Sequence, residues 1–188
     1  MTDPILFMAL GALIVLSLLW AKSRFWSFTA QRPEDYAKGT PQFDLREHLN
    51  GPILCEGVIY GPLGRVTSRF IGKFEARWDG NRGVMREHFI YDSGATQDRE
   101  WRLELGNDGR IKAEADDLVE PGQGQMTGSA VQLKYRIRLP EESGGHVLDT
   151  VDWMYLAPNG TVMNRSQFRK FGIPVAELVA TMRKVDAA

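Results

Sequence analysis

Apolar and polar residues alternate from Ile53 onward, and this period of two limits what the chain can fold into more than any other feature. In the stretch 133–139, apolar residues alternate with Lys and Arg, and the stretch 65–78 repeats the pattern with aromatic residues on its apolar side. One apolar face and one charged face are typical of an antiparallel sheet with one side in water. The chain from Ile53 onward is therefore expected to be mainly β.

Seven turn signals rich in Gly, Asn, Asp and Pro interrupt this alternation and bound eight extended segments. The expected strands are 53–60, 65–78, 84–91, 95–105, 110–119, 126–139, 146–156 and 161–171. Eight strands joined by tight turns, with no helix between them, favour a single antiparallel up-and-down β-barrel. Gly72 and Gly128 lie inside long segments and are expected bend points of the barrel wall.

An amphipathic helix is expected to end the chain. Pro174 fits the first turn of such a helix. Apolar residues then recur at helical spacing: Val175, Leu178, Val179 and Met182. This helix would pack its apolar stripe on the barrel wall or across one mouth.

The beginning of the chain predicts a membrane anchor. The stretch 5–21 has 17 residues without a charge, and spanning helices need about 17–25 apolar residues. A secretory signal peptide is the alternative, but no Lys or Arg precedes the stretch, and Trp20 stands where small residues would mark a cleavage site. The expected division is a transmembrane anchor over 1–24, a juxtamembrane linker over 25–42, and a barrel domain with its helix over 43–188.

Basic residues follow the predicted anchor: Lys22, Arg24 and Arg32. Since Lys and Arg accumulate on the cytoplasmic side of spanning helices, this bias favours a cytoplasmic barrel. The expected location is the bacterial inner membrane, crossed once. The bias rests on few charges, and the side of the membrane stays open.

Composition excludes several classes of function. The net charge is −1, from 23 basic and 24 acidic residues, so no nucleic-acid partner is expected. A single cysteine, Cys55, excludes an internal disulfide and a thiolate metal cluster. The three histidines do not stand at zinc-ligand spacing, and no phosphate-binding loop or G-x-S-x-G elbow occurs. Neither a metal nor a cofactor is expected.

Two charged residues lie on apolar faces of the expected strands. Glu87 shares a face with Met85 and Phe89, and Arg99 shares one with Trp101. If the turn between these strands pairs them, Glu87 and Arg99 approach each other inside the barrel. They would form either an internal ion pair or the polar anchor of an apolar ligand pocket, because an unpaired buried charge is strongly unfavourable.

In the strand expected over 146–156, either of two sets of alternating residues can point into the barrel. If Trp153 and Tyr155 point inward, the alternation places Asp152 outward, as a helix cap or as an ion-pair partner of Arg165 or Lys170. Asn164 is expected inward, either as a hydrogen-bonded core amide or as a ligand-binding group.

Several short motifs resemble a bacterial family of uncharacterised proteins, the domain of unknown function 3833 family. The residues that carry the resemblance are Asp152-Trp153-Met154-Tyr155-Leu156, Asn164-Arg165, Lys170-Phe171-Gly172, Glu87-x-Phe89-x-Tyr91-Asp92-x-Gly94 and Arg99-x-Trp101. The resemblance covers about residues 41–185. It implies a lipocalin-like or calycin-like barrel held at a membrane, often as a lipoprotein, and it implies no known activity. This chain lacks a lipid-attachment cysteine after its apolar stretch.

The leading hypothesis is a membrane-anchored barrel that binds a small apolar or amphipathic molecule such as a lipid. The expected ligand-binding residues are Glu87, Arg99, Trp101, Trp153, Tyr155 and Asn164. The residues expected to form a structural motif are Asp152, Arg165, Lys170, Phe171 and Gly172. One alternative is an isomerase or hydrolase of lipid-like substrates with Glu87 or Asp152 as the general base. Another is a protein-interaction or scaffold module of the cell envelope, whose partner the sequence does not name.

Overall fold

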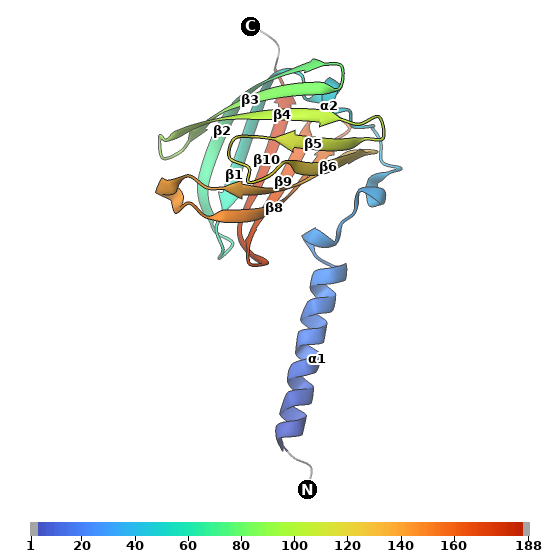
Figure 1. Ribbon diagram of the computed structural model, residues 1–188, viewed down its shortest axis with the longest axis vertical. Coiled ribbons are helices and arrows are strands. Elements are labelled where there is room, and N and C mark those ends of the chain that lie inside the picture. Colours follow the sequence, from blue (N-terminus) through green and yellow to red (C-terminus); the bar gives the residue numbers. More distant parts are fainter. Residues whose placement is uncertain (1–3, 186–188) are drawn as a thin grey trace.

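The structure is a computed structural model that describes residues 4–185, and its body is one closed antiparallel barrel of ten strands (Figure 1). Residues 1–3 of the predicted anchor and 186–188 of the predicted barrel domain lie outside the described residues. The strands are β1 (Gly51–Tyr60), β2 (Val66–Asp79), β3 (Arg82–Tyr91), β4 (Thr96–Leu105), β5 (Arg110–Glu114), β6 (Gly122–Thr127), β7 (Ala130–Arg138), β8 (Val147–Leu156), β9 (Val162–Lys170) and β10 (Ile173–Lys184).

Each strand pairs with its neighbours in sequence, and β1 pairs with β10 to close the barrel. This confirms the predicted mainly β, antiparallel up-and-down architecture. A short helix, α2 (Leu45–His48), precedes β1. The end of the barrel where β1 begins is here called the α2 end. The opposite end is called the far end and holds the β1–β2, β3–β4, β5–β6, β7–β8 and β9–β10 connections. The β7–β8 connection contains the 3₁₀ helix η3 (Glu141–Ser143).

The predicted number of eight strands is wrong, because one expected segment spans two strands and the expected C-terminal helix is a strand. The segment expected over 126–139 is interrupted at Gly128, whose φ of 54° places it in the turn between β6 and β7. Gly128 is therefore a turn residue rather than a bend within a strand. Gly72 does lie inside β2, where a Cβ atom would come within 2.5 Å of Phe74 Cε1 and 3.1 Å of Cys55 Cβ. Glycine is needed there because the side chains of Phe74 and Cys55 occupy the space that a Cβ atom would take.

The predicted C-terminal helix is also wrong, because residues 173–184 form β10. This strand pairs with β9 on one side and β1 on the other. It therefore forms hydrogen bonds with the backbone groups of two strand edges that a helix would leave unpaired. Leu178 and Met182 line the interior, whereas Val179 lies on the opposite face. Apolar residues on both faces of one strand produced the apparent helical spacing.

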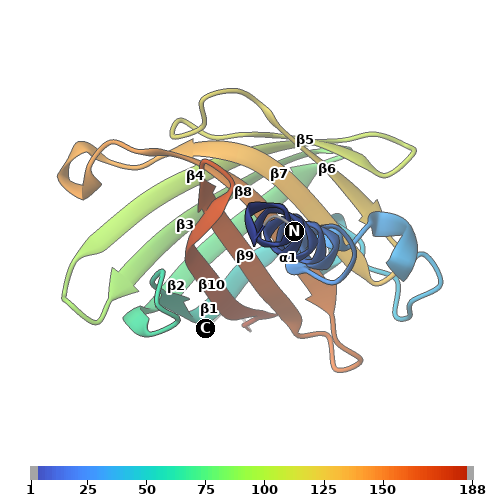
Figure 2. The ribbon, with the colours of Figure 1, turned by 90° about the horizontal axis from the view of Figure 1, so that it is seen from below.

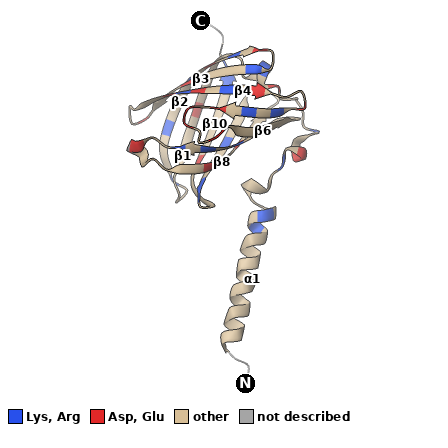
Figure 3. Cartoon of the chain, in the orientation of Figure 1, with Lys and Arg blue, Asp and Glu red and all other residues tan. Residues whose placement is uncertain are grey.

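The N-terminal helix α1 (Pro4–Phe25) extends away from the barrel (Figures 1 and 2). It is long and apolar enough to cross a membrane. A signal sequence near an N-terminus can have the same length and composition. Its only Lys and Arg residues among those described are Lys22 and Arg24 in the last turn, so the rest of the helix is free of charge in Figure 3.

Residues 27–43 connect α1 to the barrel and are here called the strap. The strap contains two 3₁₀ helices, η1 (Phe28–Ala30) and η2 (Pro33–Tyr36), and lies against the outer face of β8. It crosses the β6–β7 turn, where Phe43 N donates to Gly128 O at 2.7 Å. After the strap, Asp44 caps α2 by accepting a hydrogen bond from Arg46 N at 2.9 Å.

Candidate ligand-binding site

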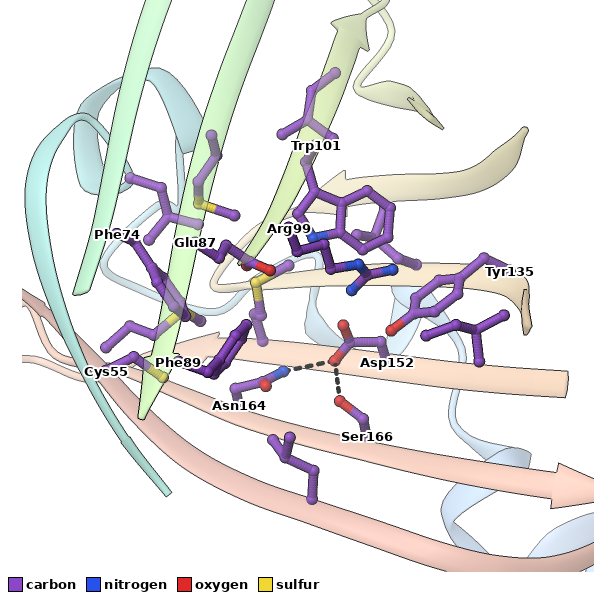
Figure 4. A pocket seen from close by; sticks show the side chains of 18 of the residues that line it. Cys55, Phe74, Glu87, Phe89, Arg99, Trp101, Tyr135, Asp152, Asn164 and Ser166 are labelled. Atoms are coloured by element: carbon purple, nitrogen blue, oxygen red, sulfur yellow. Dashed lines mark hydrogen bonds between the residues drawn. The ribbon is translucent and has the colours of Figure 1, made fainter. Parts of the chain in front are cut away.

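The barrel interior is incompletely packed and encloses a cavity of about 120 Å³ (Figure 4). At the α2 end, Leu45 and Leu49 line the cavity and are only 1% and 3% exposed. Toward the far end, four apolar lining residues are only half-buried: Phe89, Ile137, Phe168 and Leu178. The cavity is therefore closed by α2 and less completely covered at the far end.

Glu87 and Arg99 both point into this cavity from neighbouring strands (Figure 4). Glu87 of β3 is the register partner of Arg99 of β4, as the sequence pattern predicts. The Arg99 guanidinium, however, forms its ion pair with Asp117 in the β5–β6 connection. Its Nε lies 2.9 Å from Asp117 Oδ2, and its Nη2 donates to Oδ1 at 3.1 Å. Arg99 Cζ also lies 4.0 Å from the centroid of the Trp101 ring, within the range of a cation–π contact.

Glu87 is the cavity acid with the least complete hydrogen bonding. It is 8% exposed, and its Oε2 has no hydrogen-bond partner among the described residues. Burial raises the pKa of Glu87 to about 7, against the opposing effect of Arg99 and with a further rise from Asp152. Near neutral pH this carboxyl therefore exists in both protonation states and can donate or accept one more hydrogen bond.

Asp152 of β8 is a second buried acid on the cavity wall. Its Oδ1 accepts hydrogen bonds from Asn164 Nδ2 at 2.5 Å and from Ser166 Oγ at 2.8 Å, both on β9 (Figure 4). Burial raises the pKa of Asp152, and these two hydrogen bonds oppose that rise. Asn164 thus faces inward, as the sequence pattern predicts, and acts as a hydrogen-bonded amide that fixes the Asp152 carboxyl.

The expected inward orientation of Trp153 and Tyr155 is wrong. Both rings lie on the outer face of β8 beneath the strap, and Tyr36 of the strap packs on them with ring centroids 5.2 Å and 5.3 Å away. Trp153 is completely buried there, and Tyr155 Oη donates to Gln31 Oε1 at 2.7 Å. Since successive strand residues face opposite sides, this arrangement turns Asp152 inward.

The ion pair expected between Asp152 and Arg165 or Lys170 does not form. Arg165 Nε lies 2.8 Å from Glu177 Oε1 on the outer face of the neighbouring strand β10. Lys170 Nζ lies 2.9 Å from His146 Nδ1 at the far end. Both basic residues therefore stay outside the cavity. The motif residues Phe171 and Gly172 follow in the β9–β10 turn, also outside it.

Four of the six residues expected to bind a ligand line the cavity: Glu87, Arg99, Trp101 and Asn164. Tyr135 and Ser166, which were not expected to bind a ligand, also line it. Tyr135 packs edge-on against Trp101 with ring centroids 5.2 Å apart, and its inward facing follows from the alternation in 133–139. Asp117 carries no such signal because it lies in a connection. Among residues 4–185, no group of three or more His, Cys, Asp or Glu side chains is placed to hold a metal ion.

The fold and the cavity define a closed antiparallel barrel with a largely apolar interior and a few buried polar groups. The chain belongs to the family of proteins of unknown function described as DUF3833, whose model matches residues 23–184. The resemblance noted in the sequence is thereby confirmed. A comparison with curated proteins finds no significant match to this chain.

Two solved structures resemble the barrel at very low sequence identity. The S-type phycobiliprotein lyase of Guillardia theta superposes with a TM-score of 0.59 at 9% identity, over 84% of this chain and 99% of that one. A protein of unknown function from the DUF3598 family of Nostoc punctiforme gives a TM-score of 0.52 at 11% identity, over 77% of this chain and 50% of that one. At these identities the likeness concerns the fold alone.

Proposed function

We propose that the barrel binds a small hydrophobic or amphipathic, lipid-like ligand in its interior while α1 holds it at a membrane. The observation that carries this proposal is the cavity of about 120 Å³, in which apolar side chains surround Glu87, Arg99 and Asp152. Small barrels can hold one small ligand, and ligand pockets are mostly apolar with a few placed polar groups. The phycobiliprotein lyase-like fold is consistent with such a barrel.

The size of the cavity limits what it holds without rearrangement. An engineered cavity of roughly 150 Å³ in another protein accommodates benzene, so this slightly smaller space suits a ring or a short length of acyl chain. The rest of a longer ligand would extend toward the far end, where Phe168 and Leu178 are half-buried. Phe89, which is also half-buried toward the far end, offers an aromatic face along this path.

The charge of the cavity favours a neutral or cationic polar group over a carboxylate. When ionised, Glu87, Asp152 and the nearby Asp117 carry three negative charges, and Arg99 is the only cationic side chain among the lining residues. A ligand carboxylate would add a fourth negative charge in a region of low dielectric. An alcohol, amide or amine would instead use the free Oε2 of Glu87 as its hydrogen-bond partner.

Thermal unfolding of the full chain in detergent micelles, followed by near-UV circular dichroism, tests this proposal. Decanol and decylamine should raise the unfolding temperature more than decanoic acid at equal concentration, because a ligand that binds only the folded state stabilises it. Leu178→Trp, which fills the cavity path, should abolish the rise. Met163→Trp places the same residue on an exposed outer position and should preserve it. Equal responses of the two variants would refute binding in the cavity.

A second candidate function is an isomerase or hydrolase of lipid-like substrates with Glu87 as the general base. The specific support is the pKa of Glu87, raised to about 7 by burial, because a general base works best when its pKa is near the operating pH. Turnover of a component of a bacterial lipid extract should disappear in Glu87→Gln while ligand-induced stabilisation remains. Turnover that survives this substitution would exclude Glu87 as the base.

We further propose that the protein lies in the bacterial inner membrane with its barrel in the cytoplasm. The support is the position of Lys22 and Arg24 in the last turn of α1, on the side of the barrel. A C-terminal reporter that is active only in the periplasm should stay inactive when fused to the full chain. An active reporter would place the barrel on the other side.

A further inference from the structure

Two neighbouring turns at the far end carry large apolar side chains that are almost fully exposed. Leu63 in the β1–β2 turn is 84% exposed, and Phe171 in the β9–β10 turn is 90% exposed. Ile173, directly after that turn, is 67% exposed. The two turns lie close together, because the β1–β2 turn and the first residues of β10, which follow the β9–β10 turn, line one groove: Tyr60, Gly61, Pro62, Gly64, Pro174, Ala176 and Glu177. Leu63, Phe171 and Ile173 are here called the apolar tips.

Phe171 is an unusual residue for its place in the backbone. Lys170 pairs with Ile173 across the turn, and the two residues between them have positive φ angles, 53° at Phe171 and 78° at Gly172. Two-residue hairpin turns with two positive φ angles strongly favour Asn-Gly or Asp-Gly, and a bulky residue with positive φ is an outlier. Folding alone would therefore favour a small polar residue at this position, and the exposed ring calls for a contact outside the barrel.

The chain segments that carry the apolar tips are basic. No acidic residue occurs in the stretches 57–74 and 153–176, which contain both turns. Arg65, Arg169 and Lys170 flank the tips directly. Exposed apolar and aromatic side chains surrounded by Lys and Arg suit the interface of a bilayer that contains anionic lipids.

The apolar tips lie on the side of the barrel from which α1 extends. Figure 1 shows the β1–β2 and β9–β10 turns at the lower edge of the barrel, near the level at which α1 begins its course away from it. Viewed from below, along α1, the helix stands end-on in front of the barrel (Figure 2). Lys22 and Arg24 mark the helix end nearest the barrel, where lipid head groups are expected. A bilayer that contains α1 would therefore lie next to the tips.

We propose that the apolar tips insert into the head-group region of the same bilayer that holds α1. The partner is a lipid surface with anionic lipids, and the contact gives the barrel a second attachment beside its helix. It also turns the far end, where the cavity is less covered, toward the lipid. This inference goes beyond ligand binding and rests on the proposed function only in that α1 enters a membrane.

Fluorescent labelling of the full chain in nanodiscs tests the contact. Phe171→Cys and Leu63→Cys would each carry an environment-sensitive nitrobenzoxadiazole probe in nanodiscs of phosphatidylcholine with some phosphatidylglycerol. Asn107→Cys, in the exposed β4–β5 turn at the α2 end, is the matched control. The native Cys55 is buried and should stay unlabelled, which the unsubstituted chain checks.

Head-group-labelled quencher lipids should reduce the fluorescence of the probes at 171 and 63 about threefold more than at 107, because interfacial side chains lie within the head-group layer. Equal, weak quenching at all three positions would overturn the proposal. A probe at 171 that is shielded from water but not quenched by lipid would also overturn it, in favour of a protein partner.

A second variant separates lipid contact from turn stability. Phe171→Asn gives the turn its preferred Asn-Gly sequence, so the unfolding temperature should stay equal or rise. In the same variant, lipid quenching of a probe at 63 should fall by about half, because one of the tips no longer inserts. Unchanged quenching at 63 would contradict the inference. Neither result bears on the proposal that the cavity binds a ligand, since Phe171 does not line the cavity.

Discussion

Glu87→Gln should make the barrel more stable at alkaline pH. The pKa of Glu87 is raised from 4.5 to about 7 by burial, so the folded state holds this proton more tightly than the unfolded state does. A raised carboxyl pKa contributes stability that is fully present below about pH 4.5 and is lost as the pH rises through about 7. Each pKa unit corresponds to about 1.4 kcal/mol, so the full effect is about 3 kcal/mol. Gln keeps the shape of the protonated acid and has no proton to lose.

Urea unfolding of the full chain in detergent, followed by near-UV circular dichroism, measures this difference. Wild type and Glu87→Gln should have similar free energies of unfolding near pH 4, and the variant should be about 3 kcal/mol more stable near pH 8. Glu104→Gln is the control, because Glu104 is exposed on the outer face of the neighbouring strand β4. Its pH profile should follow that of wild type.

The reasoning would be refuted if Glu87→Gln were less stable than wild type near pH 8. That result would mean that the ionised carboxyl stabilises the fold through Arg99 more than burial opposes it. Glu87 would then be a structural ion-pair partner rather than a group available to a ligand.

Three further predictions concern Asp117, the glycine beneath the strap and Phe171. Asp117→Asn should lower the free energy of urea unfolding by about 3 kcal/mol, because Arg99 loses its ion-pair partner in a largely buried position; a loss under about 0.5 kcal/mol would contradict this. Gly128→Ala should speed tryptic cleavage in the strap, because the new Cβ would lie 1.9 Å from Tyr36 O. Gly160→Ala, also at positive φ but in open space, should leave cleavage unchanged. Phe171→Asn should stabilise the fold by about 1 kcal/mol in thermal unfolding, by relieving a positive φ at a bulky residue; destabilisation would show that the Phe171 ring supports the barrel.

The alternation of residues predicted much of the fold, because side chains of a strand must face opposite sides. The same rule placed Glu87 opposite Arg99 and brought both into the interior. Periodicity fails to tell which face is inside when both faces are covered by protein. The outer face of β8 is apolar because Tyr36 and the rest of the strap cover Trp153, and this reversed the expected facing of the strand.

The last strand could not be distinguished from a helix by pattern alone. Residues Val175, Leu178, Val179 and Met182 fit helical spacing, yet the open edges of β1 and β9 decide the outcome through pairing far apart in sequence. The ion-pair partner of Arg99 could not be predicted from the pattern either. Asp117 reaches it from an irregular connection, for which no repeating pattern assigns a direction.

Native mass spectrometry of the full chain tests the central claim most directly. After release from detergent micelles, wild type and Met163→Trp should retain one small neutral or basic molecule, either copurified or supplied as decanol or decylamine. Leu178→Trp, with its cavity path filled, should appear at its bare mass. If wild type also stays bare after incubation with these compounds, or if Leu178→Trp retains the molecule equally, the cavity is not a ligand-binding site.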